Sequence, residues 1–229
     1  MTSVSESTGP SEDATRIACA VLEVEGGDLA GTVEAVRASV YGVETVSVIG
    51  SGEVDEVATF GSIDDMLKSL HSEIDAVWIV HSDAVPRPDA LGALAAEMDR
   101  NHASLVGSKI VDATGIHLES VGSATDVFGE PYSGLDPDEV DLEQYDVVRD
   151  VASISGVSTL IRRDLLRGLG GLDPALPPGA AGQDLSQRAR LAGSRVMIVP
   201  SSEVRHLGSC GHDVSTWRER AGRYRAMLK

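Results

Sequence analysis

Aromatic residues are scarce in this 229-residue chain, at 3 % of the sequence, so its core must be built from aliphatic and alanine side chains. The two cysteines, Cys19 and Cys210, are too few and too far apart for a disulfide framework, which suits a reducing compartment. No run of 18 apolar residues occurs, which excludes a transmembrane helix. Residues 1–14 lack the basic start and apolar core of a signal peptide, and we predict a disordered tail. We expect a cytoplasmic protein, and the inner face of the membrane is the alternative location.

Positive charge is also in short supply, because 19 Lys and Arg face 36 Asp and Glu, for a net charge of −17. A nucleic-acid partner would require a basic face, and broad adsorption to anionic lipid would require the same, so both are disfavoured. Basic residues gather only near the C-terminus, in a predicted amphipathic helix over residues 215–228. The simplest interpretation of that group is a solvated helix face.

The apolar pattern alternates between strand-like and helix-like segments, which predicts an α/β fold with a doubly wound, mostly parallel sheet. Strands are expected at 16–24, 45–49, 75–80, 105–110, 151–161 and 195–199, and helices at 29–38, 63–70, 89–101, 163–169 and 184–191. Residues 75–80 are apolar throughout, which is typical of a central parallel strand. Ligands of such sheets lie beyond the carboxyl ends of the strands. Residues 112–150 are acidic and irregular, and we expect a lid or a surface excursion there.

Four segments, taken in order, resemble the GT-A domain of family-2 glycosyltransferases, especially bacterial rhamnosyltransferase-like members. They are VWIVHSDAVPRPDAL at 77–91, SGVSTLIRRDLLRGLGGLDP at 155–174, DLSQRARLAG at 184–193 and VPSSEVRHLGS at 199–209. The first matches a strand with a D-x-D-type tip, and the last matches a strand followed by a proline and a late histidine. The resemblance implies a GT-A (nucleotide-diphospho-sugar transferase) domain over residues 15–210, followed by the C-terminal helix at 211–229.

The resemblance also implies a reaction. A sugar would pass from a nucleotide-diphosphate sugar to a glycan or lipid-linked acceptor, with inversion, in cell-envelope or polysaccharide synthesis. A divalent cation, Mn²⁺ or Mg²⁺, would stabilise the diphosphate leaving group, and a carboxylate base would deprotonate the acceptor. Asp83 matches the last acidic position of the D-x-D tip and His206 matches the late histidine, so both are candidate metal ligands. A turn aspartate is the alternative for Asp83, and a zinc cluster of His206 with Cys210 and His212 is a weaker alternative.

Three further side chains are candidates for substrate binding. His81 replaces the first acid of the tip and could bond to a ribose or base, although a packed histidine at a strand end is the more common case. Ser82 lies between His81 and Asp83. Glu23 lies at the end of the first strand; the loop that follows departs from the Thr or Pro and acid of the family, and Glu23 and Glu25 could compensate.

The sequence departs from the family where the base should be. The E-D-x-D motif becomes residues 181–184, Ala-Gly-Gln-Asp, so Gly182 stands at the position of the base. Asp184 is the acid that remains, as a catalytic residue or as a helix N-cap. Glu130 and Glu139 are possible substitutes, and Gly182→Asp is predicted to raise turnover.

Three functions therefore stay open. The chain is a glycosyltransferase, or a non-catalytic relative that binds a nucleotide sugar or a partner, or an unrelated nucleotide-binding domain. The absence of a G-x-G-x-x-G motif after the first strand counts against the last. Many relatives continue into acceptor-binding or membrane segments, so a larger parent protein or a membrane-associated partner is expected.

Overall fold

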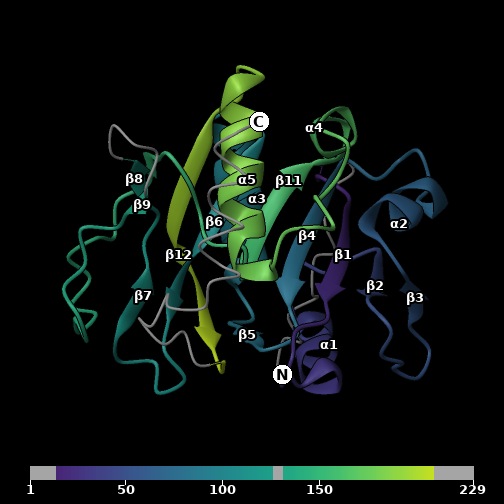
Figure 1. Ribbon diagram of the computed structural model, residues 1–229, viewed down its shortest axis with the longest axis horizontal. Coiled ribbons are helices and arrows are strands. Elements are labelled where there is room, and N and C mark those ends of the chain that lie inside the picture. Colours follow the sequence, from purple (N-terminus) through teal and green to yellow (C-terminus); the bar gives the residue numbers. More distant parts are fainter. Residues whose placement is uncertain (1–13, 126–130, 209–229) are drawn as a thin grey trace, which may run out of the picture.

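A computed structural model describes residues 14–125 and 131–208 of the chain (Figure 1). The predicted tail, apart from Ala14, and the predicted helix at 215–228 lie outside the described residues.

A mixed, mostly parallel sheet forms the centre of the molecule, and in the described part of the chain it has ten strands. Its order is β10-β12-β6-β11-β4-β1-β2-β3, with β5 pairing with β12 and β7 pairing with β6. The strands are β1 (Ile17–Leu22), β2 (Thr45–Ile49), β3 (Ala58–Phe60), β4 (Ala76–His81), β5 (Ala84–Pro86), β6 (Leu105–Val111), β7 (Leu118–Ser120), β10 (Arg149–Asp150), β11 (Ser158–Arg162) and β12 (Val196–His206). A separate pair joins β8 (Ala124–Thr125) to β9 (Pro131–Tyr132).

Helices cover both faces of this sheet (Figure 1). On one face lie α1 (Leu29–Arg37) and α3 (Ala90–Arg100), and on the other lie α2 (Ile63–Ser69), α4 (Arg163–Gly168) and α5 (Pro178–Leu191). The Ser62 hydroxyl accepts a hydrogen bond from the Asp65 amide and caps α2. The α/β prediction is therefore confirmed, with an apolar core on each side of the sheet.

Strand β4 explains why its sequence is apolar throughout. Trp78 and Val80 contribute to one core, whereas Val77 and Ile79 contribute to the other. The strand is parallel to β1 and antiparallel to β11, so the predicted central place is confirmed and the parallel pairing holds on one side only.

Several boundaries differ from the prediction for identifiable reasons. Strand β12 continues to His206 instead of ending near residue 199, because a bulge between Val199 and Glu203 accommodates Pro200 before pairing resumes. Helix α5 begins at Pro178 instead of 184, and its first turns bury small residues that give no apolar period. The acidic excursion, residues 112–150, contributes β7 and short strand pairs to the fold.

Candidate active site

The carboxyl end of β4 and the end of β12 meet at one place. His206, the last residue of β12, pairs with Ala84 of β5, directly after the tip that carries Asp83. The Leu207 amide also donates a hydrogen bond of 2.7 Å to the Asp83 carbonyl. As a result, Nε2 of His206 lies 3.1 Å from Oδ2 of Asp83. This separation is shorter than two metal–ligand bonds of about 2.1 Å each, so one cation could contact both side chains.

Glu119 is a member of this cluster that the sequence did not reveal. Its Oε2 lies 2.8 Å from Nδ1 of His206, so the imidazole is held between two carboxylates. Glu119 comes from β7, which the acidic excursion pairs onto β6. One acid in a segment rich in acids has no distinguishing spacing, and only the pairing of β7 identifies it. A carboxylate on the far nitrogen is the usual way to orient a metal-binding histidine.

Burial and charge set the protonation of the tip. Burial alone would raise the pKa of the Asp83 carboxyl, but the hydrogen bond with His206 and the charges of His206 and His81 lower this pKa below its ordinary value. Burial lowers the pKa of His81 to about 4, against the opposing effect of the Asp83 charge. At neutral pH the Asp83 carboxylate is therefore ionised and the His81 imidazole is neutral.

Two buried polar atoms at the end of β4 have no hydrogen-bond partner in the described part of the chain. In residues 14–125 and 131–208, Nε2 of His81 and Oδ1 of Asp83 are buried and have no hydrogen-bond partner. Nδ1 of His81 lies 4.0 Å from Oδ1 of Asp83, beyond hydrogen-bond reach. Buried polar groups are rarely left unpaired, so these two atoms indicate a site that a ligand completes.

Ser82 and Glu23 fix the loops around the tip. Ser82 is almost completely buried, and its hydroxyl accepts a 3.0 Å hydrogen bond from the Val24 amide. Glu23 accepts hydrogen bonds of 2.6 and 3.0 Å from the amides of Ser51 and Gly52, and these bonds lower the pKa of the Glu23 carboxyl. Glu23 therefore reaches from the end of β1 across to the loop that follows β2.

Asp184 lies inside α5 rather than at its N-cap, which is Pro177. Its side chain is 1 % exposed and bonds to Arg188 at 2.8 Å from Oδ2 to Nε. Arg188 also donates hydrogen bonds to the carbonyls of Leu169 and Gly171. These contacts give Asp184 a part in holding the turn after α4 against α5.

The Gly182 position has no room for a side chain. A Cβ atom there would lie 2.4 Å from the Gly156 nitrogen and 2.7 Å from the Ile154 carbonyl oxygen, both of them backbone atoms. The expectation that Gly182→Asp restores a base is therefore corrected, because the backbone of residues 154–156 occupies that space.

The remaining candidates lie elsewhere. The Glu139 carboxylate accepts hydrogen bonds from the Asp136 amide and from the Gln144 side chain within the excursion. Glu130, Cys210 and His212 lie outside the described residues, so the zinc alternative stays untested. Over the described ranges, no three His, Cys, Asp or Glu side chains form a group that could hold a metal ion. No helix in the same ranges combines the length and apolarity that crossing a bilayer requires.

Comparisons with known proteins identify the family and the fold of the chain. The model of the glycosyltransferase like family 2 matches residues 18–225. A crystal structure of GalNAc-T7 with UDP, GalNAc and Mn²⁺ superposes with a TM-score of 0.65 at 11 % sequence identity, over 95 % of this chain and 48 % of that chain. The chain thus spans about half the length of that structure, and at this identity the likeness shows the fold alone. No curated protein matches the chain. The chain belongs to the glycosyltransferase-like family 2, and its fold is the GT-A fold.

Proposed function

We propose that this chain is a glycosyltransferase that binds a nucleotide-diphosphate sugar together with a divalent cation at Asp83 and His206. The sugar would pass to a glycan or lipid-linked acceptor in cell-envelope or polysaccharide synthesis, in the cytoplasm or at the inner face of the membrane, with a membrane-associated partner or a larger parent protein. The observation that carries the proposal is the 3.1 Å approach of the two side chains at the carboxyl end of the central strand. The presence of UDP, GalNAc and Mn²⁺ in the GalNAc-T7 structure supports it.

The side chains at the tip suit a divalent cation. Asp83 offers an ionised carboxylate whose Oδ1 has no hydrogen-bond partner in the described part of the chain. His206 would contribute Nε2, which would exchange its hydrogen bond with Oδ2 of Asp83 for a contact with the cation. Mn²⁺ and Mg²⁺ are commonly held by one or two protein ligands, with phosphate oxygens and water completing the shell. When bound, the cation supplies charge stabilisation for the departing diphosphate.

The neighbouring residues have separate roles in the proposed site. Glu119 holds the imidazole of His206 in one orientation, through the 2.8 Å contact with Nδ1. His81, neutral at pH 7, presents Nε2 to a donor hydroxyl or base. Ser82 and Glu23 contribute to substrate binding by fixing the loops after β4, β1 and β2, which border the same end of the sheet.

A second candidate, a non-catalytic nucleotide-sugar-binding domain, is favoured by one observation. The backbone of Gly156 fills the position where the family carries its base, and Asp184 is paired with Arg188. An acceptor hydroxyl is a very weak acid, and loss of a general base typically costs ~10²–10⁴-fold in rate. Slow transfer or none is therefore expected of this chain.

Donor binding is tested by chemical unfolding with UDP-, GDP- and dTDP-sugars, with and without Mn²⁺. A matching donor at a hundredfold excess over its Kd should stabilise the fold by about 2.7 kcal/mol when Mn²⁺ is present. Asp83→Asn and His206→Gln should remove this stabilisation, whereas Asp99→Asn, a carboxylate that pairs with Arg162 at the other end of the sheet, should keep it. If no donor stabilises the wild-type chain, the proposed site is wrong.

Turnover separates the two candidates. Release of the nucleoside diphosphate is followed with the donor that binds, in the presence of glycan and lipid-linked acceptors. Product that depends on Asp83 supports the transferase, and tight donor binding without any product supports the non-catalytic domain.

A further inference from the structure

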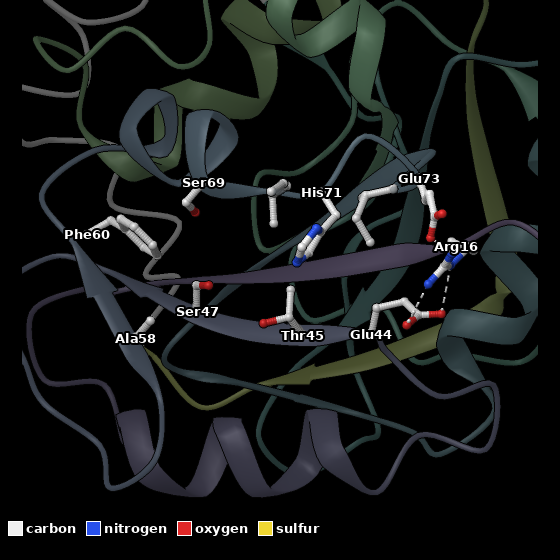
Figure 2. A pocket seen from close by; sticks show the side chains of 11 residues that line it. Arg16, Glu44, Thr45, Ser47, Ala58, Phe60, Ser69, His71 and Glu73 are labelled. Atoms are coloured by element: carbon white, nitrogen blue, oxygen red, sulfur yellow. Dashed lines mark hydrogen bonds and ion pairs between the residues drawn. The ribbon is translucent and has the colours of Figure 1, made fainter.

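A cavity of about 460 Å³ lies on the α2 side of the sheet, at the amino-terminal ends of β1 and β2 and therefore opposite to Asp83 (Figure 2). Its floor is formed by β2 and β3, and its roof by the end of α2 and the loop that leads to β4. This volume is in the range of small-molecule sites in proteins.

The strand register explains why this space is open. Ser47 of β2 lies between Ala20 of β1 and Ala58 of β3, so three small residues stand side by side on the face below α2. The helix above them is only seven residues long. Two residues further along the strands, Ile49 and Phe60 are large enough to pack against the core, and the cavity ends there.

The floor of the cavity is polar where a core would be apolar. Ser47 is only 3 % exposed and lines the cavity, and among the described residues no side-chain hydrogen bond engages its hydroxyl. Thr45 and His71 are exposed to solvent, and their side chains also line the cavity without a side-chain hydrogen bond in those ranges. Figure 2 shows the His71 ring reaching in from the roof, opposite Thr45 and Ser47. The hydroxyl of an otherwise buried serine that opens onto a cavity, without a bond to another side chain, is a group that a ligand can engage.

The charged groups at one end of the cavity leave no free charge for a ligand. The Arg16 guanidinium bonds to Glu44 at 3.1 Å from Nε to Oε1, and it also bonds to Glu73. An anionic ligand would be repelled by the carboxylates of Glu44 and Glu73, which already pair with the Arg16 guanidinium. A cationic ligand would have to displace Arg16 from these two partners. The groups that can still form hydrogen bonds with a ligand are the hydroxyls of Ser47 and Thr45, which donate and accept, and the imidazole of His71. An apolar wall is provided by Phe60 at the other end.

We propose that this cavity binds a neutral hexose unit of a glycan. The sugar hydroxyls would bond to Ser47, Thr45 and His71, and an apolar sugar face would contact Phe60. This inference does not rest on the proposed function, because the cavity shares no residue with the tip that carries Asp83.

The test is a titration of the full chain with glucose, galactose, mannose and rhamnose as methyl glycosides, followed by amide NMR shifts. At least one sugar should shift the amides of residues 44–47 and 58–60, with a Kd on the order of 1 mM. Ser47→Ala should weaken that sugar by about tenfold, the usual effect of losing a buried hydrogen bond. Ala58→Leu should block the cavity. Ser39→Ala is the matched control, because the Ser39 hydroxyl also lacks a partner in the described part of the chain and lies outside the cavity.

The Asp83→Asn variant should still bind the glycoside at this cavity, so this test can succeed or fail independently of the proposed donor site. The proposal is overturned if no glycoside shifts these amides. It is equally overturned if an alkylamine or an acidic sugar binds there more tightly than every neutral glycoside. Loss of binding in Ser39→Ala as large as in Ser47→Ala would contradict it as well.

Discussion

The two halves of the candidate active site differ in what occupies them. On the β4–β12 side, Asp83, His206 and Glu119 form a hydrogen-bonded row. Nε2 of His81 and Oδ1 of Asp83 have no hydrogen-bond partner in the described part of the chain. On the α5 side, the backbone at Gly156 lies directly against Gly182. The first half carries the side chains proposed to hold a cation, whereas Gly182 in the second half has neither an acidic side chain nor the space for one. Because the two halves come from different elements of the fold, the proposed donor binding and the proposed transfer can be tested by separate variants.

Gly156 is the residue where the halves meet. A Cβ atom on it would lie 3.4 Å from Nε2 of His81 on one side and 3.2 Å from the Gly182 nitrogen on the other. The absence of a side chain on both glycines allows α5 to approach the loop before β11, and the same loop lies beside His81.

The largest effect is expected at Gly182. Gly182→Asp and Gly182→Ala place atoms within 2.4 Å of the Gly156 backbone, and backbone cannot swing aside as a flexible side chain can. We expect a loss of unfolding free energy at or above the upper end of the ~1–3 kcal/mol typical of overpacking, without a gain in turnover. Urea unfolding measures the stability, and the donor assay measures the turnover.

Gly168→Ala is the control, because a Cβ atom there has nothing within 4 Å and the position is helical. It should leave stability unchanged or slightly higher. A stable Gly182→Asp variant with faster transfer would show that α5 can move away from Gly156. The α5 half of the site would then have room for an acidic side chain, against the comparison above.

The next effect concerns Glu119. Glu119→Gln keeps the length of the side chain but removes the charge that orients His206, so Mn²⁺ affinity in the presence of nucleotide should fall about 10–100-fold. Isothermal titration calorimetry measures this directly. Glu97→Gln on α3, another carboxylate with hydrogen bonds to neighbouring side chains, should leave it unchanged. Equal affinities in the wild type and Glu119→Gln would reduce Glu119 to a packing role.

A smaller effect is expected where the acidic excursion is anchored. The Lys109 side chain is 4 % exposed, and its Nζ lies 2.7 Å from Asp141 and 3.0 Å from Asp146. Lys109→Met leaves these carboxylates facing one another and should cost about 1–2 kcal/mol, less than a fully buried pair because Asp146 is partly solvated. Limited proteolysis should then cut residues 112–150 faster than in the wild type.

Lys68→Met is the matched control, since Lys68 pairs with Asp65 on an exposed helix surface and little change is expected. If Lys109→Met leaves both proteolysis and Mn²⁺ affinity unchanged, the excursion does not support the β4–β12 half of the site.

Sequence patterns predicted the elements that local periodicity determines. Strands β1, β2, β4 and β6 and helices α1 and α3 are close to their expected bounds, and the apolar run of β4 identified the centre of the sheet. The approach of Asp83 to His206 followed from the resemblance, and the pairing of β5 with β12 is its physical cause.

Contacts between distant segments could not be predicted in the same way. Glu119 reaches His206 only because β7 pairs with β6, and the excursion that carries it shows no period. The crowding at Gly182 depends on a close approach between two backbones, for which a glycine in the sequence is a necessary condition but not a sufficient one.

The smallest effect is expected at the turn that leads from β6 into β7. The Asp112 carboxylate bonds to Nδ1 of His117 at 3.0 Å and accepts hydrogen bonds from the Ile116 and His117 amides. The His117 side chain, with help from the Thr114 hydroxyl and these amides, holds the pKa of the Asp112 carboxyl well below its usual range, against the opposing effect of burial. A carboxyl with a depressed folded pKa adds stability that is present above its unfolded pKa of about 3.9 and is lost as the pH falls toward the folded value. Asp112→Asn should therefore lower the Tm by about 2 °C or less at pH 7, and the difference from the wild type should shrink below pH 4. Asp55→Asn, an exposed carboxylate before β3, should show no such dependence on pH. Carboxyl carbon NMR gives the Asp112 midpoint directly, and an ordinary value there would mean that this turn does not hold β7 and Glu119 beside His206.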